Sequence, residues 1–269
     1  MPGAGKKTVA EFSKMKQRGE KIVMMTAYDA PTAAIAAEAG VDILLVGDSL
    51  AMTMLGYQNT LPLTVEESLH HCKAVRRGAP DAFIVGDMPF MSFYNNAVKE
   101  SVLNAGRFLK EAGCNAVKLE GGADSANLTA AMTAAGIPVM GHIGLLPQKV
   151  LISGYRVQGK NEDDAERIVN DAVALQEAGA FAIVLECVPL ELGRVISQKL
   201  AIPTISIGAG IHCDGQVQVF HDLIGMFDGF TPKHSKRYAE AGKIIRDAVK
   251  SYVSEVKEGV FPDDAHSFH

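Results

Sequence analysis

A short motif, Glu-Ala-Gly, recurs at the ends of helical segments and constrains the fold more than any other feature. It stands at 38–40, 111–113 and 177–179, and Ala-Ala-Gly at 134–136 is a variant. Each is soon followed by an apolar, strand-like segment, whereas the copy at 240–242 leads into more helical sequence. Glycine just past a helix takes the left-handed conformation that turns the chain back. The repeating unit is therefore helix, glycine, strand, which predicts a parallel sheet with helical crossovers.

The apolar segments predict seven strands clearly and an eighth less clearly. They span 21–27, 42–47, 82–87, 115–120, 138–142, 181–186 and 202–207, and the eighth lies near 216–220. Eight such units in 269 residues match the (βα)8 barrel, which typically has ~250 residues. We predict an α/β fold, a single (βα)8 TIM barrel domain over 1–269 with a short N-terminal helix. A doubly wound open sheet is the alternative.

Local signals place the first helices. Thr8 and Glu11 have the spacing of a capping box, and Gly19 is expected to end the short N-terminal helix that they begin. Asp29 is expected to cap the next helix, with Pro31 in its first turn.

Composition and charge exclude several classes of function. The chain is 48% hydrophobic and 21% charged, with a net charge of −5 and no basic, aromatic-studded patch that would predict nucleic-acid binding. No apolar run reaches the ~18 residues of a membrane span. The four cysteines are scattered without a CxxC pair, as is typical of free thiols in a reducing compartment. The N-terminus lacks a signal-peptide pattern, so we expect a cytoplasmic protein without membrane or nucleic-acid partners.

Reactive side chains follow the predicted strands, all at the same end. Period-2 alternation places Lys118 and Glu120 on one face of their strand and Leu119 on the other. In a barrel the polar face must be the lumen, near the end where catalytic groups of this fold gather. We therefore expect one pocket to contain the following residues: Asp48, Ser49, Asp87, Lys118, Glu120, His142 and Glu186.

Crowded carboxylates need a cation to neutralise them. Asp48 and Asp87 offer the oxygen ligands that suit Mg²⁺, and no HxH or HExxH spacing indicates zinc. Mg²⁺ that keeps open positions suits a 2-oxo acid, bound through its carboxylate and ketone, and acidifies the carbon beside the ketone. Glu186 is then the candidate base, Lys118 adds positive charge at the enolate, and His142 binds the substrate or orients a ligand.

Each of these residues also has a structural interpretation. Asp48 and Asp87 could be helix N-caps, and Glu186 could cap the helix after its strand. Lys118 could form an ion pair with the glutamate two residues later, and His142 could be a buried core histidine. Unrelated helix caps would not be expected at the ends of successive strands, so the cluster as a whole favours a functional role for these residues.

Motifs along nearly the whole chain resemble those of the ketopantoate hydroxymethyltransferase family, in the same order. They are TAYD (26–29), VGDSL (46–50), DMPF (87–90), VKLEGG (117–122), GIPVMGHIGLLPQ (136–148), VQGK (157–160), IGAG (207–210) and CDGQ (213–216). The match runs from about Thr8 to the FPDDAHSF tail at 261–268. Ser206 and the segment 230–238 depart from the family pattern, and both lie outside the predicted metal cluster.

The resemblance implies a barrel of the phosphoenolpyruvate/pyruvate superfamily and a defined reaction. A hydroxymethyl group passes from 5,10-methylenetetrahydrofolate to 3-methyl-2-oxobutanoate, which gives 2-dehydropantoate for pantothenate biosynthesis. The matched motif positions imply Mg²⁺ at Asp48, Asp87 and Glu120, the 2-oxo acid at Asp48, Ser49, Asp87 and Lys118, and the base at Glu186. The family also implies a homodecamer, a pentamer of dimers.

Three other functions stay open at this point. A lyase of the isocitrate-lyase type is one, although its KKCGH-like motif is absent here. A metal-independent aldolase that uses Lys118 as a Schiff-base nucleophile is the second. The third is a binding or scaffold protein in which the acidic cluster has no catalytic role.

Overall fold

The computed structural model describes residues 7–229 and 231–269. The chain divides into two compact units, one ending at Val219 and the other spanning Phe220–His269. In the first unit the strands close into a parallel barrel in sequence order, β1 to β8, so the predicted TIM barrel is confirmed and the open sheet is wrong. The prediction of one domain over 1–269 stays a prediction.

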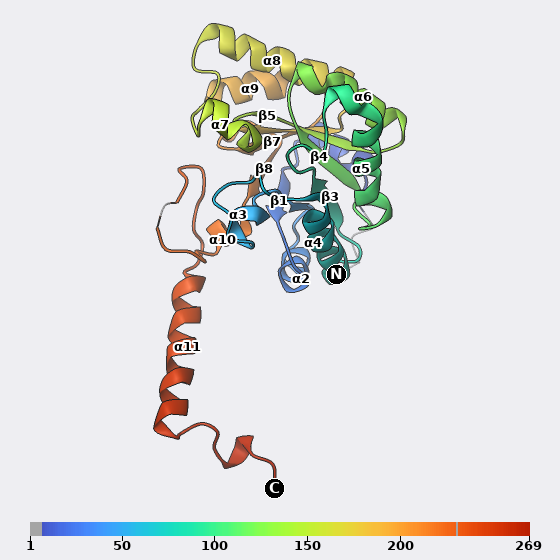
Figure 1. Ribbon diagram of the computed structural model, residues 1–269. Helices are drawn as coiled ribbons and strands as arrows, with labels where there is room; N and C mark the ends of the chain where they lie inside the picture. Colours follow the sequence, from blue (N-terminus) through green and yellow to red (C-terminus); the bar gives the residue numbers. More distant parts are fainter. Residues whose placement is uncertain (1–6, 230) are drawn as a thin grey trace. The chain divides into compact units, whose positions relative to one another are not determined.

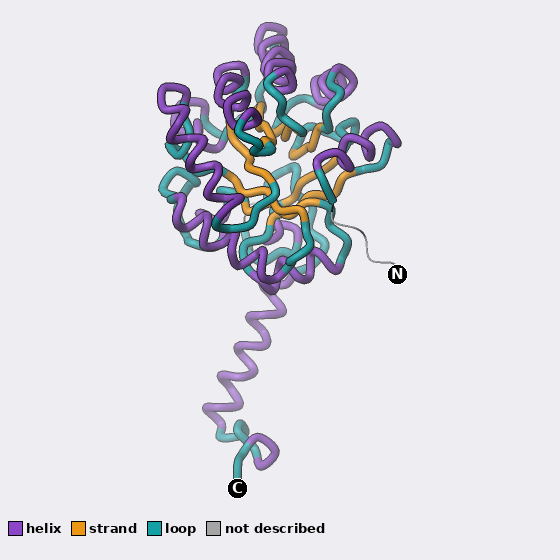
Figure 2. Tube along the Cα trace, turned by 90° about the vertical axis from the view of Figure 1, so that its right-hand side faces the viewer, coloured by secondary structure: helices purple, strands orange, loops and turns teal. Residues whose placement is uncertain are grey.

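The strands form the centre of the first unit, with helices around them (Figure 2). They are β1 (Ile22–Thr26), β2 (Ile43–Val46), β3 (Phe83–Asp87), β4 (Ala116–Glu120), β5 (Val139–Gly144), β6 (Ala182–Glu186), β7 (Thr204–Ile207) and β8 (Gly215–Gln218). Their bounds differ from the predicted ones by about one or two residues, the usual uncertainty at element ends. Parallel pairing of β8 with β1, with Val217 opposite Met24, closes the barrel.

Helices alternate with the strands as the repeated motif predicts (Figure 1). They are α1 (Val9–Arg18), α2 (Ala30–Glu38), α3 (Leu50–Thr53), α4 (Val65–Gly78), α5 (Val98–Lys110), α6 (Ala126–Ala134), α7 (Val150–Ser153), α8 (Glu162–Glu177) and α9 (Leu190–Lys199), with α10 (Phe220–Leu223) and α11 (Ala241–Glu258) in the second unit. Gly113 and Gly179 have φ of 69° and 93°, the left-handed conformation expected after a helix.

Of the two predicted helix caps, Asp29 is confirmed and the capping box at Thr8 is wrong. Asp29 Oδ1 accepts a hydrogen bond from the Thr32 backbone N–H at 2.8 Å, as predicted. Thr8 occupies the N-cap position of α1, but its side chain makes no capping hydrogen bond, so the predicted capping box is wrong. The reason is a charged competitor, because Glu11 instead accepts a hydrogen bond from the Arg18 guanidinium at 2.8 Å.

One apolar core fills most of the barrel lumen. Its strand residues are Ile22, Met24, Ile43, Leu45, Phe83, Val85, Ala116, Met140, Ala182, Val184, Ile205 and Val217. Helix α1 adds Phe12 and Met15, and the Phe12 ring lies 4.9 Å from the Phe83 ring and 6.4 Å from the Phe181 ring, centroid to centroid. Because Phe83 and Phe181 stand where their strands begin, α1 closes that end of the lumen. The other end is left for polar side chains.

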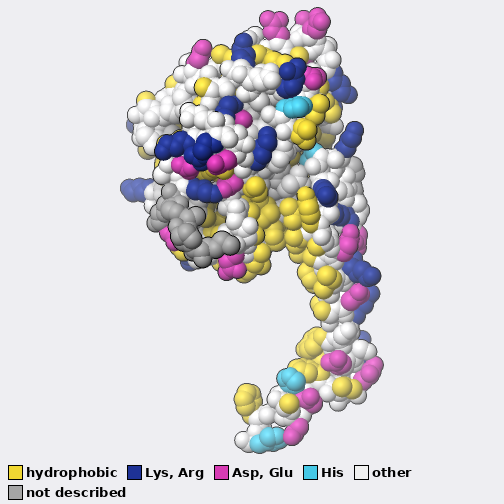
Figure 3. All heavy atoms as spheres, turned by 180° about the vertical axis from the view of Figure 1, so that it is seen from behind, with side chains coloured by type: hydrophobic (Ala, Val, Ile, Leu, Met, Phe, Trp, Pro, Cys, Tyr) yellow, Lys and Arg dark blue, Asp and Glu magenta, His cyan; other side chains and the backbone are white. Residues whose placement is uncertain are grey.

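The second unit contains α11, whose apolar side chains remain exposed. Ile245, Val249, Tyr252 and Val256 are 45–57% exposed and recur at the spacing of one helix face. The rear view shows hydrophobic side chains along one side of α11 and charged side chains along the other (Figure 3). Across the residues that the structure describes, each helix is too short or too polar to cross a bilayer.

Candidate active site

The predicted site residues gather at the end of the barrel where the strands finish. Asp87, Lys118, Glu120, His142 and Glu186 each lie two or four positions beyond an apolar lumen residue of the same strand. Since side chains alternate along a strand, all of them face the lumen. Asp87 is paired in register with Lys118, and Glu120 with His142. The structure therefore brings the predicted strand-end groups together, and the lumen changes from apolar to ionic at this level.

Lys118 pairs with Asp87, across the junction between β3 and β4. Its ammonium donates to Asp87 Oδ1 at 2.7 Å and to Oδ2 at 2.6 Å, and both side chains are buried. The alternative that Lys118 pairs with Glu120 on its own strand is wrong, because register places Asp87 directly beside it. Burial favours the neutral amine, yet Asp87, Asp48 and Glu120 raise the pKa of Lys118 above its ordinary value. Lys118 is therefore a buried cation.

Asp48 follows β2 and lies beside the Lys118–Asp87 pair. Its backbone N–H donates to Asp87 Oδ2 at 3.1 Å, which brings these two carboxylates into one cluster. Asp48 Oδ2 accepts a hydrogen bond from the side-chain amide of Gln148 at 3.2 Å. Helix α3 has Ser49 at its N-cap, so Asp48 does not cap that helix. The Asp87 carboxylate accepts hydrogen bonds from Lys118 and is not engaged as a helix cap either.

His142 stands between two carboxylates. Its Nε2 is 3.1 Å from Glu186 Oε2 and its Nδ1 is 3.5 Å from Glu120 Oε1, with the side chain 2% exposed. Burial and Lys118 lower the pKa of His142, but Glu120 and Glu186 outweigh them and raise it to about 9. The imidazole is therefore positively charged at neutral pH. It is a buried member of the ionic cluster and contacts two of the predicted site carboxylates.

Glu186 ends β6 and is the most accessible of these carboxylates, with its side chain 14% exposed. The helix that follows, α9, has Pro189 at its N-cap, so Glu186 does not cap it. Its carboxylate forms an ion pair with His142 through Oε2. Glu186 therefore faces the open end of the site with an oxygen available to a ligand.

Two residues of the site were not assigned a role from the sequence. Tyr28 lies in the TAYD motif, and its hydroxyl is 2.8 Å from Ser49 Oγ. Burial raises the pKa of Tyr28 to about 12, so it is a neutral phenol that can hold the Ser49 hydroxyl in place. Gln148 ends the GIPVMGHIGLLPQ motif and reaches the site from a turn. The one sequence signal for a role of Gln148 is that a polar residue ends an otherwise apolar motif.

The buried charges of the site do not balance. Its four carboxylates outnumber its two cations, Lys118 and His142, by two. Burial, and then Glu120, raise the pKa of Asp48 to about 6. Burial also raises the pKa of Asp87 to about 6, although Lys118 opposes the shift. Burial, together with the neighbouring carboxylates, causes these shifts, and the deficit equals the charge of one divalent cation.

The donor set fits Mg²⁺. Glu120 Oε1 is buried and forms no hydrogen bond among the described residues, although His142 Nδ1 lies 3.5 Å from it. Within residues 7–229 and 231–269, no group of three or more His, Cys, Asp or Glu side chains is preassembled as a metal cage. Mg²⁺ does not require such a cage, because it usually binds one or two carboxylates and keeps several waters. The Asp48 and Asp87 oxygens, with Glu120 nearby, suit that mode of binding.

The departures from the family pattern are Ser206, in the first unit, and 230–238, in the second unit. Ser206 is buried on the outer side of β7, because its neighbours Ile205 and Ile207 belong to the lumen core. Its hydroxyl accepts a hydrogen bond from the Ala209 backbone N–H at 3.0 Å and so supports the turn after β7. The described part of 230–238 belongs to the second unit, and residue 230 lies outside the described residues.

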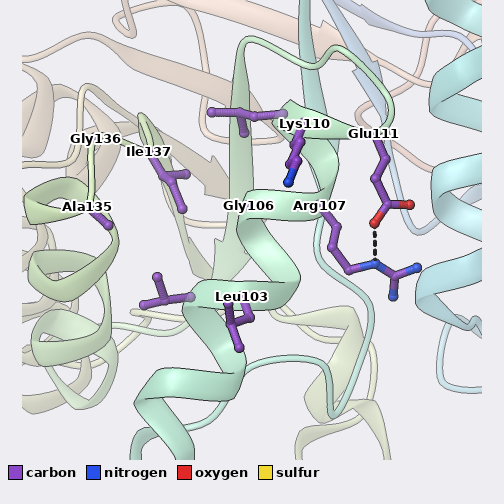
Figure 4. Close-up of a pocket in the computed structure, with 10 residues that line it drawn as sticks. Leu103, Gly106, Arg107, Lys110, Glu111, Ala135, Gly136 and Ile137 are labelled. Atoms are coloured by element: carbon purple, nitrogen blue, oxygen red, sulfur yellow. Dashed lines mark hydrogen bonds and ion pairs between the residues drawn. The ribbon is translucent and has the colours of Figure 1, made fainter.

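A separate cleft lies in the outer layer, between α5 and α6. Its volume is about 740 Å³, and Leu103, Arg107 and Ile137 are among the residues that line it. Figure 4 shows Arg107 turned toward Glu111, with which it forms an ion pair at 2.8 Å. None of the predicted site residues lines this cleft.

Comparison with known proteins agrees with the fold and identifies the family. A family model described as ketopantoate hydroxymethyltransferase matches residues 6–264. The 3-methyl-2-oxobutanoate hydroxymethyltransferase of Carboxydothermus hydrogenoformans is 55% identical over 262 residues, which cover 97% of this chain and 95% of that protein. The enzyme of the same name from Syntrophus aciditrophicus is also 55% identical, with coverage of 97% and 96%.

Solved structures of lower identity share the barrel. Phosphonopyruvate hydrolase, in a complex with oxalate and Mg²⁺, has a TM-score of 0.63 at 15% identity and covers 98% of this chain and 92% of its own. This likeness supports the fold, whereas the family model and the close relatives support a more specific assignment. The chain belongs to the ketopantoate hydroxymethyltransferase family.

Proposed function

We propose that the protein transfers a hydroxymethyl group from 5,10-methylenetetrahydrofolate to 3-methyl-2-oxobutanoate, giving 2-dehydropantoate for pantothenate biosynthesis. Relatives that carry the name of this activity are 55% identical over 97% of the chain. The observation that carries the chemistry is the buried ionic cluster at the barrel mouth, with its deficit of two positive charges. Such a cluster suits a divalent cation and an anionic 2-oxo acid.

We assign Asp48, Asp87 and Glu120 to hold Mg²⁺. When bound, Mg²⁺ supplies a Lewis acid that stabilises negative charge developing on the ketone oxygen of the 2-oxo acid. Lys118 adds a fixed positive charge beside Asp87, in a site where burial strengthens electrostatic interactions. Ser49, held by its contact with Tyr28, is placed to donate a hydrogen bond to the substrate.

We assign the proton transfer to Glu186. Its carboxylate takes the proton from C3 of the 2-oxo acid. The resulting enolate carbon then bonds to the methylene carbon, which the folate presents as an iminium, and the electron pair of the carbon–nitrogen π bond returns to nitrogen. Water finally displaces that nitrogen from the same carbon and gives it a proton, which yields the hydroxymethyl group and tetrahydrofolate. The charged His142 lies 3.1 Å from Glu186, where it can orient the carboxylate toward the proton, and we place it within reach of the substrate.

The other functions are less well supported. A Schiff-base aldolase needs a neutral lysine amine, whereas Lys118 is a buried ammonium bonded to both oxygens of Asp87. A scaffold protein has no use for several buried charges, which oppose folding unless they are compensated. The close relatives carry the name of a hydroxymethyltransferase and not of a lyase.

We propose further that the protein is cytoplasmic and assembles as a homodecamer, a pentamer of dimers. The exposed apolar face of α11 supports contact between copies, since this much apolar surface is costly to leave in water.

The assembly can be tested by substitution within α11. Wild-type protein should have ten times the 28.6 kDa mass of one chain when measured by multi-angle light scattering. Val249→Asp, on the apolar face, should lower that mass because it buries an unpaired charge. Ser254→Asp adds the same charge on the opposite side of the helix and should leave the mass unchanged. A wild-type mass of 28.6 kDa would contradict the decamer, and an intact Val249→Asp assembly would contradict the role of α11.

Product analysis tests the reaction. We expect 2-dehydropantoate when the full chain is incubated with 3-methyl-2-oxobutanoate, methylenetetrahydrofolate and Mg²⁺, as measured by mass spectrometry. EDTA should abolish product, and added excess Mg²⁺ should restore it, because the enolate needs the cation. Product formed at the same rate in EDTA would rule out the metal role. Trapping of the 2-oxo acid by borohydride would favour the lysine mechanism instead.

The assignment of the base can be tested without folate. In D₂O with Mg²⁺, the wild-type protein should exchange the C3 proton of 3-methyl-2-oxobutanoate, and Glu186→Gln should slow this exchange by about 10²-fold or more because the amide cannot accept the proton. Glu191→Gln, on the exposed first turn of α9, is the matched control and should exchange normally. Proton NMR measures the exchange. Normal exchange by Glu186→Gln would place the base elsewhere.

A further inference from the structure

One residue spans two of the proposed metal carboxylates. Gln148 lies in the turn Pro147–Lys149 that follows β5, and it is 6% exposed. Its side-chain amide donates to Asp48 Oδ2 at 3.2 Å, and its backbone N–H donates to Glu120 Oε2 at 3.0 Å. The same amide donates to the Met88 carbonyl oxygen at 3.0 Å. Gln148 thus ties together the ends of β2, β3 and β4 from a fourth part of the barrel.

In both Glu120 and Asp48, one carboxylate oxygen accepts a hydrogen bond from Gln148 and the other oxygen does not. On Glu120, Oε2 accepts from Gln148, while Oε1 is buried, forms no hydrogen bond in the described chain and has only a 3.5 Å ion pair with His142 Nδ1. On Asp48, Oδ2 accepts from Gln148, which leaves Oδ1 for another ligand. A carboxylate fixed through one oxygen presents its other oxygen in a fixed direction, and metal sites commonly orient their ligands in this way.

The side chain at 148 must meet a narrow chemical requirement. It needs two N–H donors, one for Asp48 and one for the Met88 carbonyl, on a chain of this length. Glutamate would offer no donor when ionised and would add a further negative charge to a site that already has an excess. Methionine matches glutamine in length and lacks the donors, so it removes the hydrogen bonds while filling the space.

We infer that Gln148 is a positioning residue, which holds Asp48 and Glu120 so that one oxygen of each stays available to the divalent cation. The inference rests on the proposed function, because it assumes the Mg²⁺ site. It goes beyond that proposal because it states that Gln148 raises the affinity for Mg²⁺ without itself binding the ion. The backbone N–H of residue 148 remains in any variant, so substitution tests the amide and its bond to Asp48.

Calorimetric titration of the full chain with MgCl₂ tests this role. We expect the Kd for Mg²⁺ to rise about 10–100-fold in Gln148→Met and Gln148→Ala, the usual effect of removing a group that orients a ligand. Gln198→Met, on the exposed side of α9, is the matched control and should bind Mg²⁺ as the wild type does. Saturating Mg²⁺ should restore kcat of Gln148→Met toward the wild-type value, because the ligands themselves are intact.

The outcomes separate this inference from the proposed function. If the wild type binds Mg²⁺ and both Gln148 variants bind it within about twofold of the wild type, the positioning role is overturned and the metal site stands. If both variants lose the folded state in a thermal melt, Gln148 is a structural residue and the inference is wrong. If the wild type itself fails to bind Mg²⁺, the proposed function is overturned as well.

Discussion

Ionised side chains remain buried at the mouth of this barrel only where an opposite charge lies beside them. The pair of Lys118 and Asp87, joined by hydrogen bonds of 2.6 and 2.7 Å, is the centre of that arrangement. His142 provides the second positive charge, between Glu120 and Glu186. Two negative charges are left without compensation, and taking them out of water is costly. A divalent cation satisfies this constraint, and the chemistry proposed for the site follows from its presence.

The fold makes this cluster possible by separating two environments along one lumen. Apolar side chains fill the barrel from the end closed by Phe12 to the level of Val85 and Val184, and ionic groups stand two positions further along the same strands. The apolar part lowers the local dielectric and so strengthens every interaction between the charges above it. The alternation of side chains along the strands therefore determines how far the apolar core extends and where the ionic site begins.

Much of this could be predicted from the sequence, because it depends on periodic signals. The Glu-Ala-Gly motifs gave the order of helices and strands, and alternation correctly placed Lys118 and Glu120 in the lumen. Contacts that depend on register or on loops could not be predicted in this way. The partner of Lys118 is Asp87 on the neighbouring strand, and Gln148 reaches the site from a turn that has no periodic pattern. Likewise, the capping spacing at Thr8 could not reveal that Arg18 competes for Glu11.

Anomalous diffraction from crystals soaked in Mn²⁺, which takes the same oxygen ligands as Mg²⁺, measures the central claim most directly. The charge deficit predicts one strong peak per chain, within coordination distance of the Asp48 and Asp87 carboxylates and beside Glu120. Crystals that show no peak at these carboxylates at millimolar Mn²⁺ would contradict the account, because the two uncompensated charges would then be tolerated without a metal ion.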